Sequence, residues 1–221
     1  MRVLAFVNVH AINSILTHAY LYIKMPYRHQ LIVVCRPLSQ HGSKRARLLS
    51  RAAISIGCGH VKIFVVTEIL PGVVLSSTVP LPPFVWRGEV IHEDIVSFAT
   101  PAASQVFELC PSAEIDSAIR ESCKVWDYTF ESDTTVFRMR EINNNLDTLA
   151  NAHSEYDLFT NNCGHWVIRV IYVVLKEADR LLADSLLENG KLSLDKLFTK
   201  FPGLEQILPV FKVCTHGLLD V

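Results

Sequence analysis

The chain has 221 residues, half of them apolar and 19% charged, so it can bury a sizeable core. A net charge of −1 leaves no basic excess and argues against general nucleic-acid binding. The six cysteines form no C-x-x-C pair and match no common zinc spacing. We therefore predict a reducing, cytoplasmic setting, with no metal site and no cofactor.

Residues 1–30 form a poorly patterned N-terminal segment. Its first stretch, MRVLAFVNVHAINSILTHAY, has one early arginine and an apolar run interrupted by Asn8, His10 and Asn13. Such interruptions disfavour a cleaved signal peptide. The rest of the chain has no run of 18 clean apolar residues, so no transmembrane helix is expected.

Residues 31–178 form the expected central domain, in which strands come before helices. Apolar, β-branched or alternating runs predict strands at 31–38, 59–69, 86–98 and 123–131. Helical patterns are found at 43–54 and 135–153, and 99–122 is interpreted as a loop followed by a short helix. This order is typical of an α+β domain with an antiparallel sheet.

The stretch FTNNCGHWV, residues 159–167, predicts the start of a further helix. Asn162 is a strong N-cap, which makes Cys163 the first helical residue. At about 100° per residue, Cys163 falls on an apolar stripe with Val167, Val170 and Val174. His165, Arg169, Tyr172 and Lys176 fall on the opposite face, which we expect to be polar and exposed. This helix is therefore amphipathic, with its cysteine at the N-terminal end of the buried stripe.

Two roles are open for Cys163 from these residues. A helix N-terminus carries about half a positive charge, which favours a thiolate and lowers a cysteine pKa. Free cysteine is also among the most buried residue types, so a structural role is an equal alternative. After this helix, residues 179–221 have helical patterns with apolar faces and are expected to form a helical C-terminal extension.

A nucleophilic cysteine needs a base, and nine histidines are candidates. His165 lies only two residues from Cys163, and residues two apart do not face each other on a helix. His60 and His92 fall inside predicted strands, which give a base rigid support. Alternation groups His92 with Val90 on one face of its strand. Cys163, His60 and His92 could then serve as nucleophile, base and orienter, although each histidine taken alone is more readily explained as a hydrogen-bonded structural residue.

The stretch YDLFTNNCGHWV resembles the nucleophile motif of the circularly permuted papain-like thiol enzymes. That motif reads roughly Y-N-L-L-T-N-N-C-E-H-F in the lecithin retinol acyltransferase-like branch, and N-C-N-H/N-F in the desumoylating isopeptidase-like (PPPDE) branch. The matching positions are Tyr156, Leu158, Thr160, Asn161, Asn162, Cys163 and His165. The histidine strands GHVKIFVV and EVIHEDI precede the cysteine helix, as in the acyltransferase-like branch. Gly164 departs from the usual acidic or amide residue.

The resemblance implies a permuted papain-like fold in which Cys163 is the nucleophile, His60 the base and His92 the third polar residue. Asn161 and Asn162 would form the helix cap and oxyanion region. The implied activity is hydrolysis or acyl transfer through a thioester, with an acyl lipid or a ubiquitin-like protein as substrate. Peripheral membrane contact and the oligomeric state stay open. The alternatives are a PPPDE-type isopeptidase and, given Gly164, an inactive binding module on the same fold.

Overall fold

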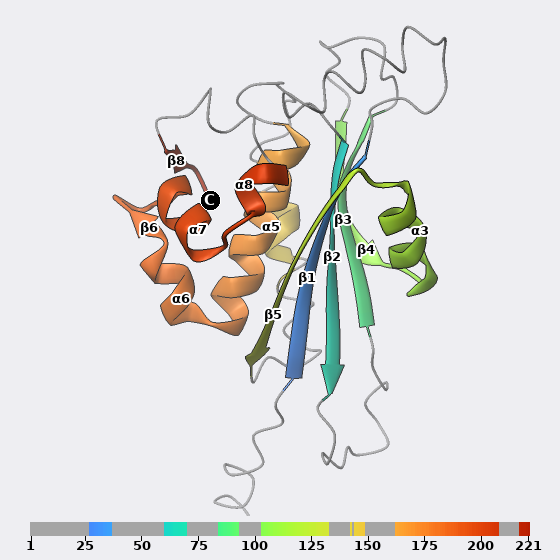
Figure 1. The fold of residues 1–221 in the computed structure, drawn as a ribbon. Coiled ribbons are helices and arrows are strands. Elements are labelled where there is room, and N and C mark those ends of the chain that lie inside the picture. Colours follow the sequence, from blue (N-terminus) through green and yellow to red (C-terminus); the bar gives the residue numbers. More distant parts are fainter. Residues whose placement is uncertain are drawn as a thin grey trace, which may run out of the picture.

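The structure is a computed structural model that describes residues 27–36, 60–69, 84–92, 103–132, 142, 144–148, 162–207 and 217–221. Its centre is a five-stranded antiparallel sheet with helices on both faces (Figure 1). The strands are β1 (Tyr27–Arg36), β2 (His60–Ile69), β3 (Phe84–His92), β4 (Ala103–Leu109) and β5 (Lys124–Ser132), in the spatial order β4-β3-β2-β1-β5. The predicted α+β class with an antiparallel sheet is therefore confirmed.

The helices are α3 (Ala113–Glu121), α5 (Cys163–Ala178), α6 (Arg180–Ser185), α7 (Leu194–Lys200) and α8 (Leu204–Ile207). Residues 142 and 144–148 are also helical, inside the helix predicted at 135–153. A small antiparallel sheet, β6-β7-β8, joins β6 (Leu187–Glu188), β7 (Lys191–Ser193) and β8 (Leu218–Leu219). The C-terminal segment therefore contains short strands as well as the expected helices.

The start of one strand and the presence of another differ from the sequence prediction. Strand β1 begins at Tyr27, inside the segment that the sequence left unpatterned. Strand β4 occupies 103–109, where a loop was predicted, because pairing with β3 stabilises a run whose own alternation is weak. The helix predicted at 43–54 and residues 1–26 lie outside the described residues.

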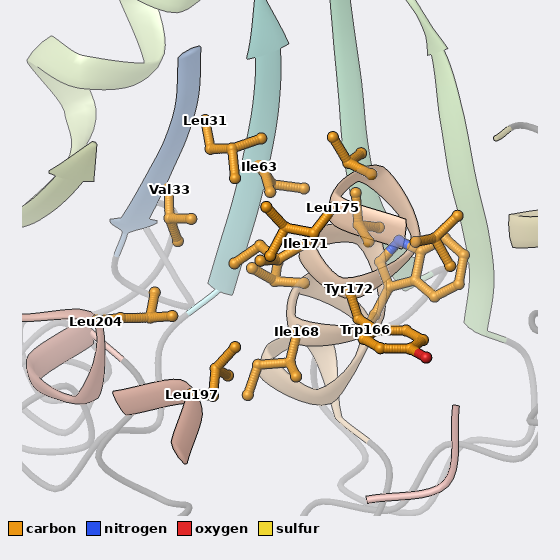
Figure 2. Close-up of a cluster of buried hydrophobic side chains, with 14 of the residues drawn as sticks. Leu31, Val33, Ile63, Trp166, Ile168, Ile171, Tyr172, Leu175, Leu197 and Leu204 are labelled. Carbon is orange, nitrogen blue, oxygen red and sulfur yellow. The ribbon is translucent and has the colours of Figure 1, made fainter. Parts of the chain in front are cut away.

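One face of the sheet packs on α5 and forms the main core (Figure 2). Leu31 and Val33 from β1 and Ile63 from β2 point toward Ile171 of α5, and all are fully buried. Gly88 in β3 leaves room for the Ile63 side chain of the neighbouring strand, since a Cβ there would lie 2.8 Å from it. Each fully buried Leu, Ile or Val stabilises the fold by about 1.5–3 kcal/mol.

The other face of the sheet packs on α3 and forms a smaller core. Its buried members are Ile32, Val34, Phe64, Val66 and Val85, and Ile115 and Ala118 of α3 pack against them. These positions alternate along β1 and β2 with those that face α5. Both faces of the central strands are therefore buried, which explains their nearly continuous apolar sequences.

The exposed polar face predicted for the cysteine helix is confirmed at Lys176 but is wrong for its other three residues. His165, Arg169 and Tyr172 are only 1%, 2% and 5% exposed. The C-terminal segment covers them: Leu197 and Leu204 share the α5 core, and the Arg169 Nε–H donates to the Asp220 carbonyl at 3.2 Å. Burying a polar group is costly unless it is hydrogen-bonded, and the Asp220 carbonyl supplies such a bond to Arg169, so this side of α5 can be buried as well.

His29 is a buried polar residue at the start of β1, on the face that packs on α5. Its Nδ1 hydrogen-bonds with the Thr67 hydroxyl at 3.0 Å and its Nε2 with the Ser132 hydroxyl at 2.7 Å. The Phe130 ring lies 5.1 Å away. Burial lowers the pKa of His29 from 6.5 to about 4. The imidazole is therefore neutral in the folded protein at neutral pH.

We predict that His29 makes the fold sensitive to mild acid. Its folded pKa lies below its unfolded value, so its contribution is present above pH 6.5 and is lost as the pH falls towards 4. The shift corresponds to roughly 3 kcal/mol. Urea unfolding at pH 7 and pH 4.5 measures this loss, and His29→Gln should make it clearly smaller. An equal loss in wild type and variant would contradict the assignment.

Candidate active site

The start of α5 is fixed by a reciprocal cap. The Asn162 side-chain oxygen accepts the Gly164 N–H at 2.9 Å and the His165 N–H at 3.2 Å. The Asn162 N–H in turn donates to His165 Nδ1 at 3.2 Å. Asn162 thus caps the helix as predicted, whereas the capping role of His165 was missed because Glu or Gln usually occupies that position. Asn161 lies outside the described residues.

Cys163 lies at one end of the main sheet. It is 6% exposed and belongs to the same core as Cys35, near the end of β1, and Val61, near the start of β2. About two turns further along α5, Val170 lies at Gly88, so the helix runs alongside β2 (Figure 1). The thiol therefore sits on the α5 face, at the end where β1 and β3 finish and β2 begins.

His60 starts β2 at that same end, but its ring is turned to the α3 face. Its Nε2–H donates to the Glu89 carboxylate at 3.2 Å. The Lys62 ammonium lies 2.7 Å from the same carboxylate oxygen, and the Arg87 Nε lies 3.2 Å from the other. Arg87 also pairs with Glu114 of α3, which fixes the face on which this cluster lies. The contact described for the His60 ring is therefore with Glu89, on the side of the sheet where α3 packs.

His60, Lys62 and Glu89 form a buried charge network, which the half-buried Arg87 joins from its edge. Burial alone would raise the Glu89 pKa, but hydrogen bonds from His60 and Lys62 and the charges of Lys62 and Arg87 lower it to about 2. Burial lowers the His60 pKa, and the hydrogen bond to Glu89 offsets part of that effect. Sequence reasoning missed Glu89, although charges at Lys62 and Glu89 inside otherwise apolar strands were a visible signal.

His92 is the last residue of β3, and its Cα pairs with that of Ala103 in β4. Lys62 pairs with Glu89, so the end of β3 lies beside the start of β2. The backbone of His92 is therefore at the same end of the sheet as Cys163. Its side chain lies outside what the structure describes.

The described residues include no group of three or more His, Cys, Asp or Glu side chains arranged to hold a metal ion. None of the described helices combines the length and the apolarity needed to span a bilayer. Comparisons with protein-family models, with curated proteins and with solved structures found no match.

Proposed function

We propose that this chain is a cysteine-dependent acyl hydrolase or acyltransferase that works through a thioester on Cys163, on a circularly permuted papain-like fold. One observation carries the proposal: Cys163 is the first residue of a reciprocally capped 16-residue helix packed on an antiparallel sheet. The chain order of strands followed by a cysteine helix, and the YDLFTNNCGHWV motif, add support.

The chemistry follows from this position. The field of the α5 N-terminus favours the Cys163 thiolate, which attacks the acyl carbonyl. The positive field at the α5 N-terminus, where Asn162 accepts the Gly164 and His165 N–H groups, also stabilises the oxyanion. A base passes the thiol proton to the leaving alcohol or amine. Water or an acceptor then resolves the thioester.

His92, rather than His60, is the base of this proposal. The His60 ring donates to Glu89 on the face away from α5. Side chains alternate between the two faces of a strand, so the sequence predicts that His92 shares a face with Val90. Val90 belongs to the core that packs on α5. His92 also ends β3 at the end of the sheet where α5 begins. His60 would then act as a structural partner of Glu89.

The substrate class is carried by the resemblance alone. The acyltransferase-like branch corresponds to a lipid ester, and the PPPDE-like branch to an isopeptide bond on a ubiquitin-like protein. Parallel assays with an acyl lipid and with an isopeptide-linked conjugate separate the two. Peripheral membrane contact belongs with the lipid alternative and is tested by vesicle co-sedimentation.

A second candidate is an inactive binding module on the same fold. It is favoured by the 6% exposure of Cys163 and by the engagement of His60 with Glu89, since a nucleophile must be reached by its substrate. Gly164 at the position after the cysteine is consistent with this alternative. The reactivity of Cys163 discriminates between the two.

We predict that Cys163 is the fastest of the six cysteines to react with iodoacetamide at pH 6. An ordinary thiol with a pKa of about 8.5 is only about 0.3% thiolate at that pH. Peptide mapping by mass spectrometry after brief labelling measures the order. Cys110 is an internal control, because burial raises its pKa to about 11 and it should react slowly. First labelling at Cys58 or Cys123 would instead favour the binding module.

A further inference from the structure

Two cysteines outside the proposed catalytic groups lie against each other where β1 meets β5. Cys35 is the penultimate residue of β1 and is 2% exposed, whereas Cys123 precedes β5 and is exposed. The Cys123 N–H donates to the Cys35 carbonyl at 2.9 Å. The Cys123 thiol donates to the same carbonyl at 3.2 Å. The side chain of Cys123 is therefore folded back onto Cys35.

The strand register fixes how far apart the two backbones lie. Cys35 pairs with Lys124 across β1 and β5, so Cys123 is a diagonal neighbour of Cys35. Diagonal neighbours in an antiparallel ladder have Cα atoms about 6 Å apart. Disulfides form at Cα separations of roughly 4.4–6.8 Å, a range that includes this spacing, and the Cys123 side chain already turns back onto Cys35.

We propose that Cys35 and Cys123 are a thiol–disulfide exchange site, which reacts with a low-molecular-weight disulfide such as oxidised glutathione to give an intramolecular disulfide. This goes beyond the proposed function and does not rest on it.

The reaction proceeds in two balanced steps. The Cys123 thiolate attacks one sulfur of oxidised glutathione, breaks its S–S bond and releases one glutathione thiolate, which takes up the proton that Cys123 lost. Cys35 then loses its proton and attacks the Cys123 sulfur, which releases the second glutathione as a thiol. Two protein thiols are oxidised and one glutathione disulfide is reduced to two thiols.

The order of the steps follows from the environments of the two thiols. Burial raises the pKa of Cys35, and repulsion from Cys123 and Cys163 and the hydrogen bond with Cys123 raise it further, to about 12. Cys35 therefore stays protonated while the exposed Cys123 reacts first. In the mixed disulfide, Cys123 no longer repels the Cys35 thiolate or hydrogen-bonds to the Cys35 thiol, so two of the causes that raise the Cys35 pKa are removed before the second step.

Cys163 is the competing partner, because its charge also acts on the Cys35 thiol. The backbone contact of 2.9 Å and the side-chain contact of 3.2 Å favour Cys123, which is already held against Cys35. A Cys35–Cys123 bond would tie β1 to β5 at the end of the sheet where Cys163 lies.

The test uses the full chain, incubated with oxidised glutathione, blocked with iodoacetamide and analysed by intact mass and a non-reducing peptide map. We expect the loss of two hydrogen atoms, a Cys35–Cys123 cross-linked peptide pair, and reversal by dithiothreitol. Cys163→Ala should form the same bond, which separates this inference from the proposed nucleophile. Cys110→Ser is the matched control and should not change the result.

Cys123→Ser keeps a hydrogen-bond donor at an exposed site, and its folding is checked by circular dichroism. It should form no intramolecular disulfide. A Cys35–Cys163 cross-link in the wild type, or glutathione that stays on Cys123 without reaching Cys35, would overturn the proposal.

Discussion

Replacing Cys163 with alanine should abolish acyl-enzyme formation, the largest effect on activity expected of any substitution in this chain. The proposed thioester needs the Cys163 sulfur, and no other described cysteine lies at the start of a capped helix. A p-nitrophenyl ester gives two readouts, the burst of nitrophenol and the mass of the acylated chain. Both should fall to the level of buffer alone.

Cys163→Ser is the matched control, since it preserves the size of the side chain and the Asn162 cap. It should keep the fold and lose most of the burst, because a hydroxyl without a strong base is a weak nucleophile. An undiminished burst in Cys163→Ala would place the nucleophile elsewhere in the chain.

Histidine variants extend this result to the base. His92→Ala should lower the acylation rate by about 10²–10⁴-fold, the usual contribution of a general base. His92→Gln keeps a hydrogen-bonding group and should retain more activity than His92→Ala. His60→Gln keeps a donor for Glu89 and should change the rate little. Loss of activity in His60→Gln alone would return the base role to His60.

Replacing Glu89 with alanine should destabilise the fold by about 3–5 kcal/mol, the usual cost of breaking a buried ion pair from one side. Glu89 is 6% exposed and accepts from Lys62 at 2.7 Å, with Arg87 3.2 Å from its other oxygen. Without this carboxylate, Lys62 keeps a buried positive charge and loses its described partner. Urea unfolding followed by circular dichroism at pH 7 measures the change in the free energy of unfolding.

Glu108→Ala is the matched control for Glu89. Glu108 also pairs with Arg87, but its side chain is 52% exposed, so its removal should cost less than about 1 kcal/mol. Acid gives a second check. The folded Glu89 pKa of about 2 lies below the ordinary value of 4.5, so its contribution is present above pH 4.5 and is lost as the pH falls towards 2. The difference in the free energy of unfolding between wild type and Glu89→Ala should become smaller over that pH range. If Glu89→Ala and Glu108→Ala lowered the free energy of unfolding equally at pH 7, the network would not be stabilising.

The sequence by itself determined the features that depend on local pattern. Period-two and β-branched runs located β1, β2, β3 and β5, and the strands-before-helices order predicted an antiparallel α+β fold. The NNC stretch predicted the cap and the first residue of α5, because an N-cap needs only the residue and its next three neighbours. These features depend on residues that are close together in the sequence, so the sequence alone is enough to predict them.

The tertiary structure decided which face each side chain occupies. His60 begins its strand as predicted, yet alternation along β2 turns its ring to Glu89 and away from α5, and a shift of one residue would have reversed this. On the face of α5 that was predicted to be exposed, His165, Arg169 and Tyr172 are buried because the C-terminal segment packs on them, and helical periodicity alone does not show what covers a polar residue. The contact between Cys35 and Cys123 likewise depends on the pairing of β1 with β5, strands 88 residues apart in sequence at this point. Facing, coverage and long-range pairing are properties of the packed sheet, so only the three-dimensional structure fixed them.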